Sequence, residues 1–416
     1  MSQVTHDGSL EGTRNVHVVG HLGWQEVGGS KFEAAPELVM EQEIGRPFLY
    51  VASGGRIVVI DISDPSAPRT STSIDLEAAS GGGATVVDVD LAKLGDRRYL
   101  IVAAKKHARS GPAILIFDMP SPSQGSPQVA ASYDAVDSPL TSIFAYKHSS
   151  GKALLFAAAG KEILGLDLEM LVEGGEALVG SYPTPPLIDT TFSGFRDVYA
   201  AFEPVTQQDR LYGAGAGGYY VYDVTDVSLP AVEAQVSAAA VRLGTRIAAS
   251  PDGRYLVTAA GYRTSPIYIY DVEPALEKSL PSVRTAVGAW TADWRNRSRS
   301  FEVRWPYVFV AALHDGFQMF NMRDASEPYT VGFARTWSGL LPKVSERDRE
   351  EEGAWDLDVR NADGLIAVSD THSGVWLIRV DAFEGWHGHS WGQPNASTAQ
   401  DWDSGPDGAS LSGVTK

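Results

Sequence analysis

The chain has 416 residues, of which 44% are hydrophobic and 21% are charged, and it contains no cysteine. This composition suits a globular protein with a large core, and the lack of thiols excludes disulfides, cysteine nucleophiles and thiolate metal sites. The formal net charge of −18 disfavours binding to phosphate backbones, so we expect no nucleic-acid partner. The N-terminus lacks a basic segment followed by an apolar one, and no apolar run reaches the ~18 residues of a membrane helix. We therefore expect no membrane span and a cytoplasmic location.

One pattern recurs seven times along the chain. An apolar run that ends in small residues is followed by a short loop and a second apolar run, as in "RPFLYVASGGRIVVIDI". A polar residue near the end of the second run recurs with a period of about 53 residues, which is the size of a propeller blade. The recurring positions are Asp61, Asp118, Asp167, Asp223, Asp271, Asn321 and Arg379.

Each copy has further strand candidates on either side. The segments before the copies are, in chain order, "PELVMEQ", "ATVVDVDL", "TSIFAYKH", "FRDVYAAF", "TRIAAS", "SFEVRW" and "WDLDVR". Those after the first six copies are "RTSTSIDL", "VAASYD", "ALVGSY", "AVEAQVSA", "RTAVGAW" and "YTVGFART". Their alternation and their β-branched and aromatic residues indicate strands, so the chain is predicted to be all-β, a seven-bladed β-propeller with four strands per blade.

The seventh copy has no strand after it, but the N-terminus offers one. "NVHVVGHLGW", Asn15 to Trp24, resembles the outermost strand "EALVGSYPT". We expect this N-terminal strand to be the outer strand of the last blade and so to close the propeller, which removes an exposed sheet edge.

These assignments predict the domain organisation. Residues 1–14 are an N-terminal tail, residues 15–383 are the propeller, and residues 384–416 are a C-terminal extension. Three tryptophans in the extension argue against complete disorder, so we expect it to pack on the propeller with its last residues disordered.

The stretch "DISDPSAP" after the first pair of runs has relatives at Asp223 and Asn321. Asp, Ser and Pro are typical of tight turns, and the alternating acids of a calcium loop are missing, so we interpret the stretch as a turn. "LYVASGGRIVVIDISDPSAPRTSTSID" resembles the LVIVD-repeat family of β-propeller proteins. The resemblance implies a propeller and little about function. Many members of that family are exported or surface-attached, which leaves an extracytoplasmic location open.

Histidines occur in loops that join the second and third strands of a blade. His314 and His372 belong to adjacent blades, with Asp315 and Asp370 beside them, and His107 lies in the same kind of loop farther away. Two imidazoles and two carboxylates could ligate a divalent ion or act as an acid/base pair. The alternative is that these are ordinary polar residues of exposed turns.

The first strands of the blades, which line the channel of a propeller, carry charged residues. We predict a ligand-binding set of Arg196, Arg246, Arg299 and Asp356, together with Trp294 from a nearby loop, because arginines anchor carboxylates and phosphates. The alternative is internal ion pairing. These strands carry no inward-facing histidine, which disfavours a four-histidine iron site, and we predict no metal and no cofactor.

Two loops leading into first strands are longer than the others. Trp290 to Ser300 combines tryptophan with arginine, and Trp337 to Trp355 is a charged insertion between tryptophans. Such insertions are often functional, although the two loops could also pair with each other.

The expected function is that of a non-catalytic binding or scaffolding propeller, which presents a site on its loop face to a protein partner or a small-molecule ligand. We expect a monomer. The alternative is an enzyme with a metal-assisted or acid/base site at the channel mouth, in which His314, Asp315, Asp370 and His372 take part.

Overall fold

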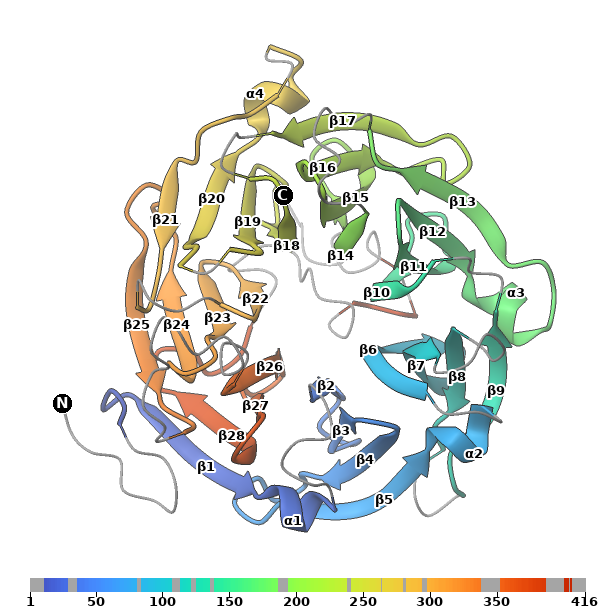
Figure 1. Cartoon of the computed structure of the whole chain (residues 1–416), viewed down its shortest axis with the longest axis vertical. Helices are drawn as coiled ribbons and strands as arrows, with labels where there is room; N and C mark the ends of the chain where they lie inside the picture. Colours follow the sequence, from blue (N-terminus) through green and yellow to red (C-terminus); the bar gives the residue numbers. More distant parts are fainter. Residues whose placement is uncertain are drawn as a thin grey trace, which may run out of the picture. The chain divides into compact units, whose positions relative to one another are not determined.

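The protein is a seven-bladed β-propeller, as the repeat pattern predicts (Figure 1). The computed structural model describes residues 11–28, 36–80, 84–106, 113–120, 125–134, 138–185, 194–237, 241–262, 264–279, 282–293, 298–337, 352–386, 400–403 and 405. These residues form seven four-stranded sheets. The chain divides into two compact units: residues 1–79, 263–266 and 290–387 form the first unit, and the remainder forms the second unit.

The first unit contains blades one, six and seven. Blade one is β2 (Glu37–Met40), β3 (Phe48–Ser53), β4 (Arg56–Asp61) and β5 (Arg69–Asp75), followed by the short helix α2 (Leu76–Ser80). Blade six is β22 (Ser300–Arg304), β23 (Tyr307–Ala311), β24 (Phe317–Asn321) and β25 (Tyr329–Ala334). Blade seven is β26 (Ala354–Val359), β27 (Ile366–Asp370), β28 (Gly374–Val380) and β1 (Val16–Leu22), and helix α1 (Trp24–Val27) follows β1.

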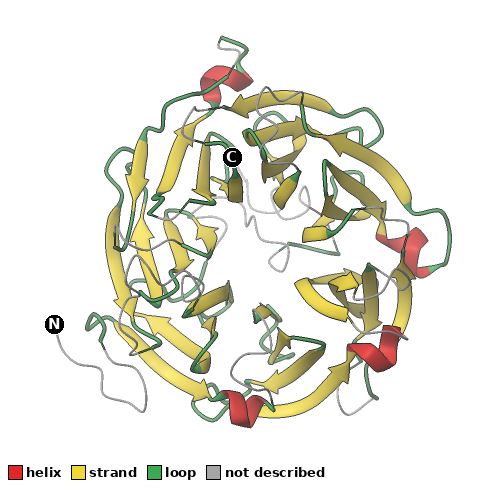
Figure 2. Ribbon diagram, in the orientation of Figure 1, coloured by secondary structure: helices red, strands yellow, loops and turns green. Residues whose placement is uncertain are grey.

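The second unit contains blades two to five. Blade two is β6 (Ala84–Leu94), β7 (Arg97–Lys106), β8 (Ile114–Asp118) and β9 (Gln128–Tyr133). Blade three is β10 (Leu140–Lys147), β11 (Ala153–Ala159), β12 (Glu162–Asp167) and β13 (Leu178–Pro183), with helix α3 (Leu168–Val172) after β12. Blade four is β14 (Phe195–Glu203), β15 (Gln208–Gly215), β16 (Gly218–Asp223) and β17 (Ala231–Val236). Blade five is β18 (Gly244–Ala249), β19 (Tyr255–Ala260), β20 (Ile267–Asp271) and β21 (Gly288–Trp290), with helix α4 (Glu273–Leu276) after β20. The helices, red in Figure 2, are single short turns between strands.

The N-terminal strand completes blade seven, as predicted. β1 pairs antiparallel with β28, from Val16 opposite Val380 to Leu22 opposite Val375. The described part of the expected tail, residues 11–14, lies beside β25, where the Thr13 amide donates to the Phe333 carbonyl at 2.9 Å. The chain therefore covers the outer edge of blade six before it enters blade seven.

Burial explains why the two middle strands of a blade read as continuous apolar runs. In β11 every residue is buried, because a middle strand packs on sheets at both of its faces. The outer strand β5 is mostly exposed and correspondingly polar. The sequence pattern therefore follows the position of each strand within its blade.

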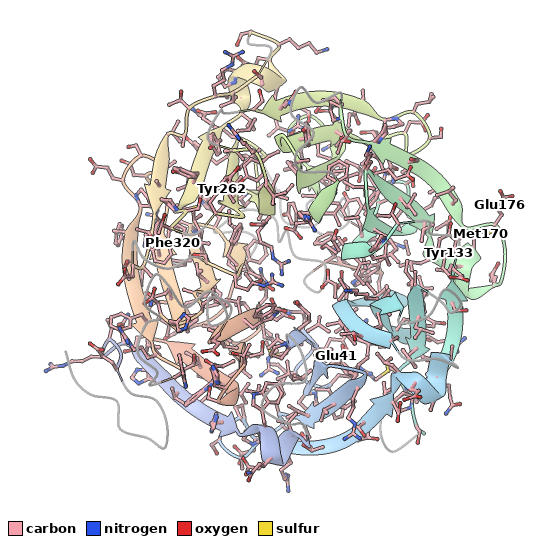
Figure 3. All side chains as sticks on the ribbon, viewed as in Figure 1. Glu41, Tyr133, Met170, Glu176, Tyr262 and Phe320 are labelled. Carbon is pink, nitrogen blue, oxygen red and sulfur yellow. The ribbon has the colours of Figure 1, made fainter. Side chains whose placement is uncertain are left out.

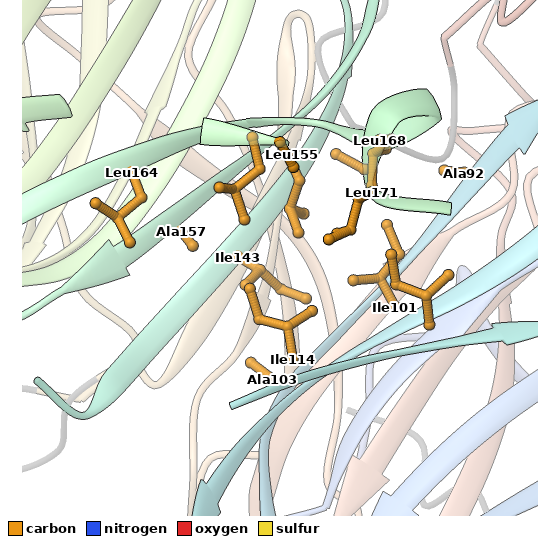
Figure 4. Close-up of a cluster of buried hydrophobic side chains, with 14 of the residues drawn as sticks. Ala92, Ile101, Ala103, Ile114, Ile143, Leu155, Ala157, Leu164, Leu168 and Leu171 are labelled. Carbon is orange, nitrogen blue, oxygen red and sulfur yellow. The ribbon is translucent and has the colours of Figure 1, made fainter. Parts of the chain in front are cut away.

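The core of the second unit includes a cluster between blades two and three, which Figure 4 shows around Ile101, Ile143 and Leu155. Trp402 of the C-terminal extension belongs to this cluster. The side chain of nearby Gln400 accepts from the Lys147 amide at 2.6 Å and donates to the Ala145 carbonyl at 2.9 Å. Gln400 of the extension therefore bonds to blade three and Trp402 packs in this cluster, while the expected disorder of its last residues falls outside the described residues.

Carboxylates of the first strands join neighbouring blades. In the second unit, Asp88 and Asp90 of blade two accept from the Ile143 and Ala145 amides of blade three at 2.8 and 2.7 Å. Asp197 of blade four accepts in the same way from blade five, through the Ile247 amide at 2.9 Å. Each carboxylate supplies the hydrogen-bond acceptor that a buried amide at a blade boundary would otherwise lack.

In the first unit the same contact joins blade seven to blade one. Asp356 accepts from the Leu38 amide at 3.0 Å and Asp358 from the Met40 amide at 2.7 Å. Asp358 also accepts from the amide of Val359 at 2.7 Å.

The "DISDPSAP" stretch is a turn, as predicted. Asp61 accepts from the Ser63 amide, and Asp64 accepts from the Ser66 amide, both at 2.9 Å. The turn also contacts the preceding blade, because a Cβ placed on Gly20 of β1 would lie 2.0 Å from the Pro65 carbonyl oxygen.

Trp290, at the start of the first long loop, is held in place by blade six. Its ring stacks on Phe320, labelled in Figure 3, with centroids 4.6 Å apart and an interplanar angle of 14°. Its indole N–H donates to Thr330 Oγ1 at 3.0 Å. One end of this loop is therefore anchored in the core of the first unit.

Candidate functional site

Two turns of the first unit carry the histidines that the sequence singles out. His314 lies in the β23–β24 turn. The preceding residue, Leu313, forms two backbone hydrogen bonds with Ala354, at 3.0 and 2.9 Å. This ties the turn of blade six to the start of β26 in blade seven. His314 is consequently buried, with 3% of its surface exposed, whereas the sequence suggested an exposed loop residue as one alternative.

An indole joins the two imidazoles. Trp337 stacks on His372 with ring centroids 4.4 Å apart and planes 14° apart. The His314 ring lies on the same indole at 5.4 Å with a tilt of 50°. His314, Trp337 and His372 therefore form one aromatic cluster, which we call the His–Trp–His cluster.

The His314 ring carries an unusual polar atom. Its Nε2 is buried and has no hydrogen-bond partner among the described residues. Burial, and secondarily the nearby His372, lower the pKa of His314 to about 4. The ring is therefore neutral at physiological pH, and Nε2 can donate to or accept from a bound group according to its tautomer.

The two aspartates beside the histidines are both buried. Asp370 is fully buried, and its carboxylate accepts from the His372 amide at 2.8 Å, the Ser373 amide at 2.9 Å and Thr336 Oγ1 at 2.6 Å. These bonds hold the β27–β28 turn in place. Asp315 is also buried, with 5% of its surface exposed, and its carbonyl accepts from the side chain of Gln318 at 2.8 Å.

A different carboxylate approaches the second imidazole. His372 Nε2 lies 3.2 Å from Glu352 Oε2. Within the described residues, no group of three or more His, Asp or Glu side chains is arranged to hold a metal ion.

Arg299 and Asp356 of the predicted ligand-binding set lie in the first unit. The Arg299 guanidinium is 4.1 Å from the ring centre of Trp355, and its Nη2 is 3.3 Å from Glu37 Oε1. Trp355 Nε1 donates to the same Glu37 oxygen at 3.0 Å. Asp356 is 8% exposed and accepts the blade-one amide of Leu38. These internal contacts match the ion-pairing alternative, and ligand binding by these residues stays a prediction.

The other members of the set belong to the second unit or lie outside the described residues. Arg246 Nη1 is 3.3 Å from Asp197 Oδ1, and this pair is partly buried. Arg196 is exposed, at the irregular position between Phe195 and Asp197 in β14. Trp294 and His107 fall outside the described residues.

Two acidic side chains, Glu302 and Asp358, interact in the first unit. The pKa of Glu302 is raised well above its usual range, first by burial and then by the charge of Asp358. Arg304 counters this effect, with Nη2 2.9 Å from Glu302 Oε2. Burial also raises the pKa of Asp358. Asp358 accepts two backbone amides that favour its ionised form, so we assign the shared proton to Glu302.

Sequence reasoning missed Trp337, Glu352 and Glu37 as neighbours of the candidate residues. The tryptophan at the start of the long insertion was a usable signal, because an indole flanking a loop often anchors it. No sequence pattern indicated Glu352 or Glu37 as part of a site. Their partners, His372 and Arg299, are distant in the sequence and become neighbours only through the fold.

The chain is thus a seven-bladed β-propeller in which two histidines of adjacent blades contact one tryptophan. Residues 47–75 match the family model of the LVIVD repeat, as the resemblance predicted. The crystal structure of Chaetomium thermophilum Raptor has a similar fold, with 12% sequence identity and a TM-score of 0.54. That likeness covers 83% of this chain and 28% of the Raptor chain, and at this identity it concerns the fold alone.

No curated protein matches the sequence. Among the described helices, none is long and apolar enough to cross a membrane.

Proposed function

We propose that the protein is a binding propeller, and that the His–Trp–His cluster is its non-catalytic ligand site. The ligand is a small molecule, or a side chain of a protein partner, that combines a planar apolar part with a hydrogen-bonding group. The net charge of −18 supports the expectation that nucleic acid is not the partner.

One observation carries this proposal: within the described part of the chain, the buried Nε2 of His314 has no hydrogen-bond partner. A buried polar group without a hydrogen bond costs about 1–3 kcal/mol, so proteins rarely keep one without a use. A ligand that bonded to Nε2 would satisfy it, and the indole of Trp337 beside it offers a flat apolar surface. His314 is already positioned by the β23–β24 turn, which is bonded to Ala354 through Leu313, and this lowers the ordering cost of binding.

The test compares wild-type protein with His314→Leu in a thermal-shift screen of a fragment library. Leucine is apolar and removes the orphan nitrogen, so we expect the free variant to be more stable by about 1 kcal/mol. We expect fragments that raise the Tm of the wild type to have no effect on the variant. His17→Leu, in β1 of the same unit and half exposed, is the matched control and should keep the response. Hits that bind His314→Leu as well as the wild type would overturn the proposal.

The acid/base alternative is supported by a single contact, His372 Nε2 to Glu352 Oε2 at 3.2 Å, because a carboxylate can orient a catalytic imidazole. His372→Gln separates the two proposals. An activity found with a panel of ester and phosphoester substrates and lost in this variant would favour the enzyme, whereas retained fragment binding without activity favours the binding propeller.

A further inference from the structure

The β10–β11 hairpin of the second unit places a serine against a histidine. The turn between the strands is closed by the His148 amide, which donates to the Lys152 carbonyl, and by the Gly151 amide, which donates to the His148 carbonyl, both at 2.9 Å. Ser150 lies at the tip of this turn and is exposed, whereas His148 is buried, with 2% of its surface exposed. An accessible hydroxyl therefore rests on an imidazole that has little freedom to move.

The hydrogen bonds of His148 define its tautomer. The Ser150 amide donates to Nδ1 at 3.0 Å, so Nδ1 carries no proton. Nε2 consequently carries the proton, and it lies 3.0 Å from the Val224 carbonyl oxygen and 3.3 Å from Asp209 Oδ2. Ser150 Oγ is 2.7 Å from Nδ1, so the hydroxyl donates to the unprotonated nitrogen.

Asp209 is suited to stabilise a positive charge on His148. It is fully buried, and its other contacts are neutral donors: Tyr146 OH at 2.6 Å, the Ser149 amide at 3.0 Å and the Ser149 hydroxyl. A buried carboxylate with only neutral donors attracts an imidazolium strongly, because little solvent screens the pair.

We propose that Ser150 is an activated nucleophile, with His148 as its general base and Asp209 as the residue that orients the base, and that it reacts with small activated esters. The arrangement has the two features that identify an activated nucleophile: a hydroxyl within hydrogen-bond reach of a base, and a third group that positions the base. Its order along the chain is His148, Ser150, Asp209, which is of no consequence because such groups are recognised by geometry.

The chemistry balances with the groups present. Ser150 Oγ forms a bond to the acyl carbon while its proton passes to His148 Nδ1. The bond to the leaving oxygen then breaks, and that oxygen takes the proton from Nδ1. Water attacks the acylated serine in the reverse sense and releases the carboxylic acid. Once Nδ1 is protonated, the Ser150 amide loses its acceptor, so its N–H becomes a donor for the developing oxyanion.

The same chain contains matched serines that lack a histidine. Ser66, Ser228 and Ser326 are exposed turn residues whose hydroxyls donate to aspartates at 2.6, 2.7 and 2.7 Å. A carboxylate partner is thus common to these three turns. The imidazole is the feature that distinguishes Ser150 from them.

The test treats the full chain with an alkyl fluorophosphonate probe and maps adducts by peptide mass spectrometry. Attack by Oγ forms the oxygen–phosphorus bond, fluoride leaves, and the proton passes to His148. We expect Ser150 to be labelled at least tenfold faster than the three matched serines. Ser150→Ala should abolish this adduct, and Ser228→Ala should leave it unchanged.

His148→Gln should lower the labelling rate of Ser150 at least tenfold, at a temperature where circular dichroism shows the variant folded. If the variant does not fold, the labelling rates of Ser150 and the three matched serines in the wild type still test the proposal. The absence of a Ser150 adduct, or labelling of Ser150 no faster than of Ser66, Ser228 and Ser326, would refute the proposal.

Discussion

Glu302 illustrates how burial and neighbouring charge act on a single side chain. Its Oε2 atom is buried, although 21% of the side chain is exposed, and the negative charge of Asp358 is close by. Asp363 shows the opposite result. Burial raises the pKa of Asp363, but hydrogen bonds from Arg360 and Arg379 outweigh it and lower the pKa to about 2. The difference is that two arginines face Asp363, whereas Glu302 faces a second carboxylate as well as Arg304.

The raised pKa of Glu302 makes stability depend on pH. Folded protein holds this proton more tightly than the unfolded chain, so the stabilisation is complete below the unfolded pKa and is lost as pH rises through the folded pKa. Glu302→Gln removes the part of this pH dependence that comes from Glu302. Near pH 4 we therefore expect the free energy of unfolding of the variant to equal that of the wild type or to be lower. At pH 8 we expect it to be higher than that of the wild type by roughly 1 kcal/mol.

Urea unfolding followed by tryptophan fluorescence at both pH values measures this difference. Glu327→Gln, at an exposed turn position of the same blade, is the control and should change stability equally at both pH values. A Glu302→Gln difference that does not vary with pH would show that Glu302 is ionised in the folded protein.

At the scale of elements, the first strands are joined by carboxylates as well as by apolar packing. Asp90 uses both oxygens, one for the Leu91 amide and one for the Ala145 amide of the next blade, each at 2.7 Å. Asp358 repeats the arrangement in the first unit with Val359 and Met40. The D-x-D spacing of these strands places both carboxylates on one face, because side chains alternate along a strand.

Asp90→Asn should destabilise the second unit by about 1–3 kcal/mol. Asparagine keeps the shape but offers one acceptor oxygen, so one of the two amides would face an N–H group. The matched control is Asp96→Asn in the β6–β7 turn, which is exposed and should change stability by less than about 0.5 kcal/mol. Both values come from urea denaturation, and equal effects of the two changes would contradict a linking role for Asp90.

At the scale of the whole molecule, the "DISDPSAP" turn and its relative after Asp223 contact the outer strand of a neighbouring blade in the same unit. The turn of blade one lies on Gly20 in the outer strand of blade seven, within 2.0 Å of where a Cβ would be. In the second unit, a Cβ on Gly180 of β13 would lie 2.4 Å from the Val227 carbonyl oxygen of blade four. The glycine of the outer strand and the turn of the next blade are therefore complementary parts of one contact.

Gly20→Ala tests the closure of blade seven against blade one. The added methyl group would overlap the Pro65 carbonyl oxygen, which is backbone and cannot rotate away, so we expect a loss of 2 kcal/mol or more, on the order of other overpacking changes. Gly45→Ala is the control, because nothing lies within 4 Å of its Cβ. Thermal unfolding of both variants measures the effect, and a Gly20→Ala protein as stable as Gly45→Ala would show that the close approach is absent.

The sequence predicted most of the fold and little of the site. The strands, the blade count and the closing strand follow from local periodicity, which is read residue by residue. The spatial neighbours of the candidate residues do not follow from local periodicity. His314 contacts Trp337, and its turn is bonded to β26, and neither contact leaves a local pattern in the sequence.

By itself, the amino-acid sequence determined that the chain folds as a seven-bladed propeller with its N-terminal strand in the last blade. It also determined that the "DISDPSAP" stretch is a turn. These properties depend on short-range patterns of apolar, polar and turn-forming residues. Only the tertiary structure decided that His314 is buried and neutral, that Asp370 serves its own turn, and that Ser150 rests on His148 and Asp209. Burial, pKa and hydrogen-bond partners depend on groups brought together from distant parts of the chain, so no local pattern specifies them.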